Sequence, residues 1–123
     1  MTEKRVLVPG LDDPITVSPA GTTVTVRLGG RTIAKSDRAL VLREASYPPV
    51  HYLPLEDVED GVLRPSSHET YCPFKGDASY YSLLDGDAVI VDAVWSYVAP
   101  YDAVAEIANH VAFYPQHVEI SAA

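Results

Sequence analysis

The stretch ASYYSLLDGDAVIVDAVWSY, residues 78 to 97, decides the fold of this 123-residue chain. Its two arms, 78–84 and 88–97, are rich in Tyr, Val and other residues that favour strands. Between the arms stands Asp85-Gly86-Asp87, and Asp and Gly are the residues that tight turns prefer. The stretch therefore predicts a β-hairpin, and with it an antiparallel sheet.

Alternate residues of a strand share one face, so each arm of this hairpin has a face that bears aromatic rings. These co-facial residues are Ala78, Tyr80 and Ser82 on the first arm and Ala93, Trp95 and Tyr97 on the second. Small residues beside large rings leave a groove that an apolar or ring-shaped ligand can fill. The alternative is that Trp95 fills the core.

A second hairpin lies earlier in the sequence. Residues 23–28 alternate as Thr-Val-Thr-Val-Arg-Leu, Gly29-Gly30 follows as a two-residue turn, and residues 31–35 return. Further extended segments are expected at 38–44, 51–53, 70–74, 110–114 and 118–121.

Arg38 and Glu44 stand at the two ends of the expected strand 38–44. The middle of that strand, Leu40 and Leu42, shares their face. The two charges are therefore expected either at the mouth of a pocket or as ordinary exposed residues.

Residues 101–109 predict the one convincing helix. Val104, Ile107 and Ala108 fall on one face at helical spacing, and Asn109 is suited to end the helix. A single helical turn is expected at 55–58. We therefore expect one domain over residues 1–123, mainly β, with a rolled antiparallel sheet or small barrel of seven to eight strands.

The charge distribution argues against two classes of partner. The formal net charge is −8, and no Lys or Arg follows Lys75. Nucleic acids and anionic membranes are bound through clustered cations, and this chain has no basic cluster. We expect neither as a partner.

The number of cysteines indicates in which cellular compartment the protein is expected. Cys72 is the one cysteine, so no disulfide can form within the chain, which favours a reducing compartment. The N-terminal residues lack the apolar region and cleavage site of a signal peptide. No apolar run approaches the roughly 20 residues of a membrane helix. A cytoplasmic protein is expected.

Lys75 is the candidate anion anchor. A lone cation beside the exposed amides of Gly76 can hold a carboxylate or phosphate, or form a Schiff base if its amine is neutral. The ordinary interpretation is an exposed lysine on a turn. If Lys75 anchors an anion, Lys75→Ala should leave stability within about 0.5 kcal/mol, because an exposed lysine contributes little to the fold. Together with the aromatic rings, the expected ligand-binding residues are Tyr71, Lys75, Tyr80, Trp95 and Tyr97.

Two other classes of function stay open. In an enzyme, Cys72 or Lys75 would act as nucleophile, with His68 or a Tyr as its acid-base partner. The ordinary interpretation of Cys72 is a buried thiol that packs as a small apolar residue. A structural or interaction protein, such as a homodimer joined through an edge strand, is the third alternative. The four His do not fall at ligand spacing, so we expect no metal and no cofactor.

Several segments resemble one family. The most specific is 72–76, Cys-Pro-Phe-Lys-Gly, followed by Ala-Ser-Tyr at 78–80; the others are 30–36, 52–54, 57–58, 70–71, 93–97 and 110–114. They resemble domain of unknown function family 427, over about residues 14–120. The resemblance implies a compact, mostly-β domain found mainly in bacteria, and it implies no catalytic residues. Asp13 stands where family members often have a His before the Pro-Ile-Thr segment, which puts any role of that imidazole in doubt.

The family also carries a nucleotidyltransferase label, which the residues do not support. Nucleotidyl transfer needs paired carboxylates for magnesium and a loop that holds the triphosphate. The nearest pair, Asp85 and Asp87, belongs to a hairpin turn, and no Gly-rich loop ends in Lys-Ser or Lys-Thr. We expect instead a module that binds a small molecule in an aromatic pocket, with Lys75 able to hold an anionic group.

Overall fold

The computed structural model describes residues 5–10 and 14–123. Within these residues the chain forms ten β-strands and two short 3₁₀ helices. The strands are β1 Ile15–Pro19, β2 Val24–Leu28, β3 Arg31–Ser36, β4 Leu40–Glu44, β5 Val50–Pro54, β6 Leu63–Cys72, β7 Gly76–Asp85, β8 Ala88–Ser96, β9 His110–Phe113 and β10 Glu119–Ala122. The helices are η1 Leu55–Asp57 and η2 Asp102–Ile107.

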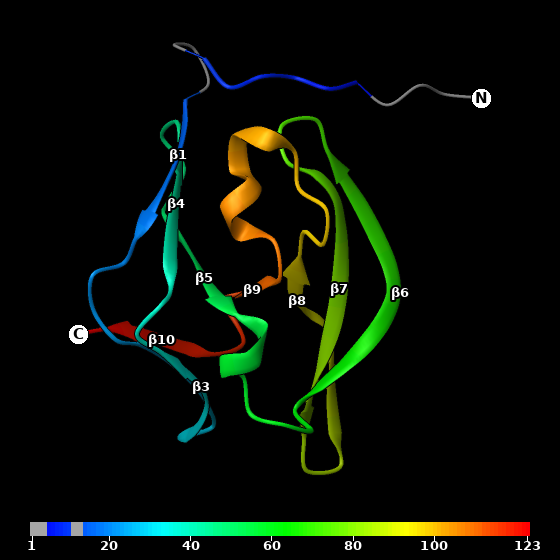
Figure 1. Cartoon of the computed structure of the whole chain (residues 1–123). Coiled ribbons are helices and arrows are strands. Elements are labelled where there is room, and N and C mark those ends of the chain that lie inside the picture. Colours follow the sequence, from blue (N-terminus) through cyan, green and yellow to red (C-terminus); the bar gives the residue numbers. More distant parts are fainter. Residues whose placement is uncertain (1–4, 11–13) are drawn as a thin grey trace.

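The strands form two antiparallel sheets. Seven of them lie in the order β1-β4-β5-β9-β8-β7-β6, and the other three in the order β10-β2-β3 (Figure 1). The prediction of a mainly-β domain built on a rolled antiparallel sheet is confirmed. Over the described residues the large sheet stays open between β1 and β6, so it does not close into a barrel.

Both predicted hairpins are present, and their turns show why. Leu28 pairs directly with Arg31, and the two glycines between them have φ of +57° and +83°. A two-residue turn of this kind requires positive φ, which glycine adopts without steric penalty. In the second hairpin Asp85 pairs with Ala88.

β1 and most of β6 were not predicted from the sequence, and these strands are the two edges of the large sheet. β1 ends in Pro19, and β6 contains Pro65 next to a shift in its pairing with β7. Proline is tolerated at sheet edges because an edge strand leaves N–H groups unpaired. β6 is also largely exposed, so it lacks the alternation of apolar residues that reveals a half-buried strand.

The predicted helix at 101–109 is shorter than expected and is a 3₁₀ helix with a kink at Val104. Val104 and Ile107 are fully buried, as their spacing predicted, whereas Ala108 is half-buried. Asn109 adopts a φ of +62°, the left-handed conformation that commonly ends a helix. The helix lies between β4 and β7 in Figure 1 and packs on one face of the large sheet.

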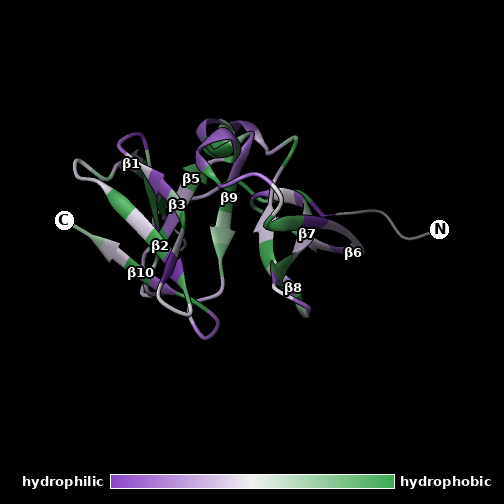
Figure 2. Cartoon of the chain, turned by 90° about the horizontal axis from the view of Figure 1, so that it is seen from below, coloured by the Kyte–Doolittle hydropathy of each residue, from purple (hydrophilic) through white to green (hydrophobic). Residues whose placement is uncertain are grey.

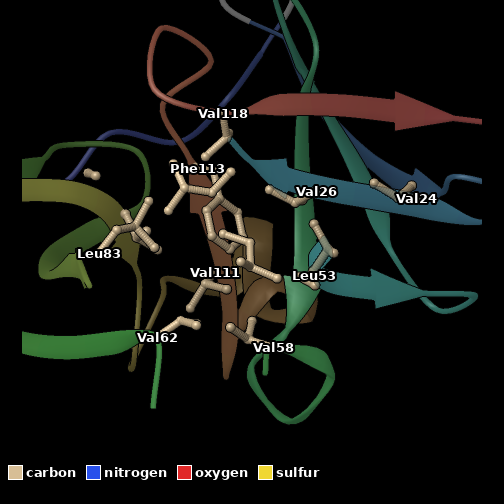
Figure 3. Close-up of a cluster of buried hydrophobic side chains, with 14 of the residues drawn as sticks. Val24, Val26, Leu53, Val58, Val62, Leu83, Val111, Phe113 and Val118 are labelled. Carbon is tan, nitrogen blue, oxygen red and sulfur yellow. The ribbon is translucent and has the colours of Figure 1, made fainter. Parts of the chain in front are cut away.

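Two buried clusters occupy the two sides of the large sheet. One joins it to the three-stranded sheet, and Figure 3 shows Val24 and Val26 of β2 in this cluster with Leu53, Val111 and Phe113. The other includes Leu42, Tyr52 and Tyr97, together with the two buried residues of η2. Seen from below, β9 lies between β5 and the β6–β8 strands (Figure 2). The described residues contain no helix of the length and apolar character that a membrane span needs.

Candidate functional site

An open cavity of about 240 Å³ lies on the face of the large sheet that carries η2. Its lining combines aromatic rings, two aliphatic side chains and one oppositely charged pair. The lining residues are Leu42, Glu44, Val50, Tyr52, Lys75, Tyr80, Trp95, Tyr97 and Tyr114.

The period of two along each strand explains which residues meet there. Leu42 and Glu44 are alternate residues at the end of β4, and Val50 and Tyr52 are alternate residues of β5. Trp95 pairs directly with Tyr80 across β7 and β8. Four of the five predicted ligand-binding residues, namely Lys75, Tyr80, Trp95 and Tyr97, therefore share this cavity.

The small residue Ala93 does not lie where the strand period predicted. It packs in the cluster beneath the three-stranded sheet, together with its neighbour Val94. The cause is a register shift between β7 and β8, at which Asp92 has a φ of +53°. Such an irregularity adds residues to one strand, so the faces no longer alternate through it.

Trp95 is the central ring of the aromatic wall. Its Nε1–H donates to the hydroxyl of Tyr52 at 3.1 Å, and the two rings meet edge to face. The ring of Tyr114 also lies against it, with 4.5 Å between centroids. Tyr52 is buried, whereas Trp95 and Tyr114 are half-buried. Trp95 therefore lines an open cavity and does not fill a sealed core.

Lys75 is buried, so the expectation of an exposed lysine is wrong. Only 8% of the residue is exposed, and its Nζ lies 2.5 Å from Glu44 Oε1 and 3.8 Å from Cys72 Sγ. The turn between β6 and β7 directs it inward: the Lys75 N–H donates to the Cys72 carbonyl, and its carbonyl accepts from Tyr101. Gly76, with a φ of +109°, completes this turn.

The tyrosines around the cavity hold their protons firmly. Burial raises the pKa of Tyr52 to about 12 and that of Tyr114 to about 12, and it also raises the pKa of Tyr97. Near neutral pH these phenols are therefore hydrogen-bonding groups and poor general bases. Among the described residues, the Tyr97 hydroxyl has no hydrogen-bond partner, although it lines the cavity.

Tyr71 does not line the cavity, although it was expected to. Its hydroxyl lies 2.8 Å from the hydroxyl of Tyr101 and also donates to the backbone carbonyl of Arg5. The period of the strand accounts for this, since Tyr71 precedes Cys72 on β6 and points to the other side.

Of the three candidate catalytic residues, Cys72 and Lys75 are in contact, whereas His68 contacts neither of them through a hydrogen bond that the structure describes. Cys72 is half-buried and contacts the ammonium of Lys75. His68 is exposed and lies against the ring of Tyr80, with 4.5 Å between centroids. Among the hydrogen bonds of the described residues, none joins His68 to Cys72 or to Lys75.

Tyr52 and Tyr114 were not predicted as site residues. Glu44 was expected at a strand end, either at the mouth of a pocket or as an ordinary exposed charge, and it lines the cavity. Tyr52 falls in a short segment, and alternation with Val50 on one face was the available signal. Arg38, the other strand-end charge, lies elsewhere: it is largely exposed and pairs with Glu56 and Asp57. Asp13 lies outside the described residues. The described part of the chain contains no group of three or more His, Cys, Asp or Glu side chains suited to a metal ion.

The fold and the cavity define a class of protein: a small antiparallel β domain whose rolled sheet holds an aromatic cavity with one ion pair inside. The family follows from comparison with known sequences. The chain belongs to the family described as domain of unknown function (DUF427), whose model matches residues 16–123 and carries a nucleotidyltransferase label. A comparison with curated proteins finds no match.

Proposed function

We propose that the protein binds a small ring-shaped molecule that carries a polar group. The observation that supports this most is the convergence of Trp95, Tyr52 and Tyr114 on the same cavity as the Lys75–Glu44 pair. Aromatic walls with a few polar groups are typical of small-molecule sites.

The size of the cavity limits the ligand. A cavity of about 150 Å³ is enough for benzene. The cavity here measures about 240 Å³ and is open on one side. It therefore suits a single ring with one or two substituents better than a nucleotide with its phosphates.

Trp95 makes the test simple, because it is the one tryptophan of the chain. We expect small aromatic compounds that bind to change its fluorescence and to raise the melting temperature. Val50→Phe narrows the cavity and should abolish both effects. Val91→Phe, at an exposed position of β8, is the matched control. The proposal fails if no compound of a broad library changes either signal, or if Val50→Phe binds as well as the wild type.

Catalysis through Cys72 or Lys75 is the second candidate, favoured by the 3.8 Å contact between Nζ and Sγ. A neighbouring cation stabilises a thiolate. Against Schiff-base chemistry, Glu44 stabilises the charged ammonium, whereas attack on a carbonyl needs the neutral amine.

Two measurements separate catalysis from binding. Alkylation of Cys72 at neutral pH should be no faster than that of a free cysteine if the thiol is not activated. If Lys75 forms no Schiff base, borohydride should trap no adduct between its amine and a carbonyl compound. Rapid alkylation, or a trapped adduct, would favour an enzyme.

The nucleotidyltransferase label gains no support from the carboxylates. Asp85 and Asp87 are exposed at the tip of the β7–β8 hairpin. Magnesium-dependent transfer uses carboxylates that converge on one site beside the substrate. We propose binding as the role of this chain.

We further propose that the protein works in the bacterial cytoplasm without nucleic acid or membrane as a partner. The single cysteine, the net charge of −8 and the family resemblance support this.

The alternative of a homodimer joined through an edge strand is tested by size-exclusion chromatography with light scattering. A monomer at high protein concentration would contradict it.

A further inference from the structure

Each of the two charged side chains in the cavity already has the other as its counter-charge, at hydrogen-bonding distance. This arrangement limits the charge that a ligand can carry. Lys75 and Glu44 are the only charged side chains among the lining residues that the structure describes. Their charges cancel, and both side chains are largely buried, at 10% and 24% exposure. A charged ligand would therefore lose its hydration on binding and find no free counter-charge in the cavity, so its binding would be unfavourable.

We infer that the ligand is an uncharged ring containing a cyclic amide, whose C=O accepts from Lys75 Nζ while its N–H donates to the Glu44 carboxylate. This inference rests on the function proposed above, because it specifies the ligand of that same cavity. It replaces the anionic ligand that Lys75 alone suggested.

The spacing of the two protein atoms supports this class of ligand. Nζ and Oε1 lie 2.5 Å apart. The O and N atoms of an amide are separated by about 2.2 Å, from ordinary bond lengths. In a ring the amide is cis, so C=O and N–H point to the same side, whereas a linear amide is trans and points them apart. A cyclic amide can therefore make two side-by-side hydrogen bonds to the pair.

Both partners have hydrogen-bonding capacity to spare. An ammonium has three N–H donors. Among the described residues, Nζ donates to Glu44 and lies at a long 3.8 Å from Cys72 Sγ. A carboxylate accepts at about four lone pairs on two oxygens. The rings of Trp95 and Tyr114 then provide apolar surface for the rest of the ligand.

Three ring compounds of similar size test the inference, with binding followed by the amide NMR signals of the wild-type protein. They are 2-pyridone, N-methyl-2-pyridone, which lacks the N–H, and benzoate, which is an anion. We expect 2-pyridone to bind about tenfold more tightly than either of the others, the effect of one hydrogen bond to a charged group.

A single substitution should abolish the preference for the uncharged ring over the anion. Glu44→Gln keeps the shape and one acceptor but leaves the ammonium of Lys75 without its counter-charge. Benzoate should then bind about tenfold more tightly than to the wild type, and 2-pyridone should change by less than about threefold. Glu56→Gln is the matched control, since Glu56 pairs with Arg38 and does not line this cavity.

The possible failures are distinguishable. If benzoate or N-methyl-2-pyridone binds the wild type as tightly as 2-pyridone, or if Glu44→Gln leaves the tenfold difference between 2-pyridone and benzoate unchanged, the cyclic-amide inference is overturned. In that case the proposed function stands, provided that Val50→Phe abolishes binding of the rings. If none of the three compounds binds the wild type or Glu44→Gln, this inference is overturned, and the proposed function then rests on the library screen.

Discussion

Lys75 Nζ lies 2.5 Å from Glu44 Oε1, although three strands separate β4 from β7 in the sheet. Neighbouring strands lie about 4.8 Å apart, so a flat sheet would hold β4 and β7 about 19 Å from each other. The contact is therefore a direct consequence of rolling. It connects the two halves of the sheet across the cavity, because Glu44 ends β4 and Lys75 directly precedes β7.

This position predicts a structural contribution from Lys75. Lys75→Ala leaves Glu44 without its partner in a largely buried place, and we expect the free energy of unfolding to fall by about 2–4 kcal/mol. Urea denaturation followed by circular dichroism measures it.

The matched control is Arg38→Ala, which removes an ion pair whose arginine side chain is 62% exposed. It should change the free energy of unfolding by about 0.5 kcal/mol or less. A double variant, Lys75→Met with Glu44→Leu, should recover most of the loss, because no unpaired charge remains. Equal, small effects of Lys75→Ala and Arg38→Ala would contradict the structural role.

Truncation to Ala is expected to lower the free energy of unfolding less at Trp95 than at Phe113. Phe113 is 2% exposed in the core, so Phe113→Ala should lower the free energy of unfolding by about 3–5 kcal/mol. Trp95 is half-buried beside the cavity, so Trp95→Ala should lower it by only about 1–3 kcal/mol. Thermal and urea unfolding compare the two. A larger loss at Trp95 would mean that its ring belongs to the closed core.

The buried phenols predict loss of stability at high pH. In the unfolded chain a tyrosine releases its proton near pH 10, whereas Tyr52 and Tyr114 release theirs at about 12. Between these values the folded state binds more protons, so the free energy of unfolding should fall as pH rises from about 10 to about 12.

Tyr52→Phe should make that decline shallower, and the exposed position Tyr47 supplies the control Tyr47→Phe. Denaturation curves at several pH values measure the slope. An unchanged slope in Tyr52→Phe would show that Tyr52 does not hold its proton more tightly in the folded state.

Gly76 is expected to tolerate no side chain. Its φ of +109° lies in a range that other residues rarely adopt, whereas an added Cβ would make only an ordinary contact, at 3.5 Å, with the carbonyl oxygen of Ala99. Gly76→Ala should lower the free energy of unfolding by about 1–3 kcal/mol through backbone strain. Gly10→Ala is the control, because nothing lies within 4 Å of its added Cβ. If the two variants unfold alike, strain at the turn does not limit this position.

Local chemistry determined the parts of this protein that were predictable from sequence. The turns at Gly29-Gly30 and Asp85-Gly86-Asp87 require particular backbone conformations, and few residue types adopt them. The placement of Trp95 and Tyr97 on one face follows from the period of a strand, which is also a local property. Most of the predicted strands and two buried residues of η2 were found in this way.

Only the tertiary structure decided what surrounds Lys75 and Trp95. Glu44, Tyr52 and Tyr114 reach them through the order β4-β5-β9-β8-β7, in which β5 pairs with β9, a strand far from it in the sequence. No local pattern encodes that order, because it depends on which edges pair and on how strongly the sheet rolls. The burial of Lys75 and the charge balance of the cavity follow from that order and that curvature.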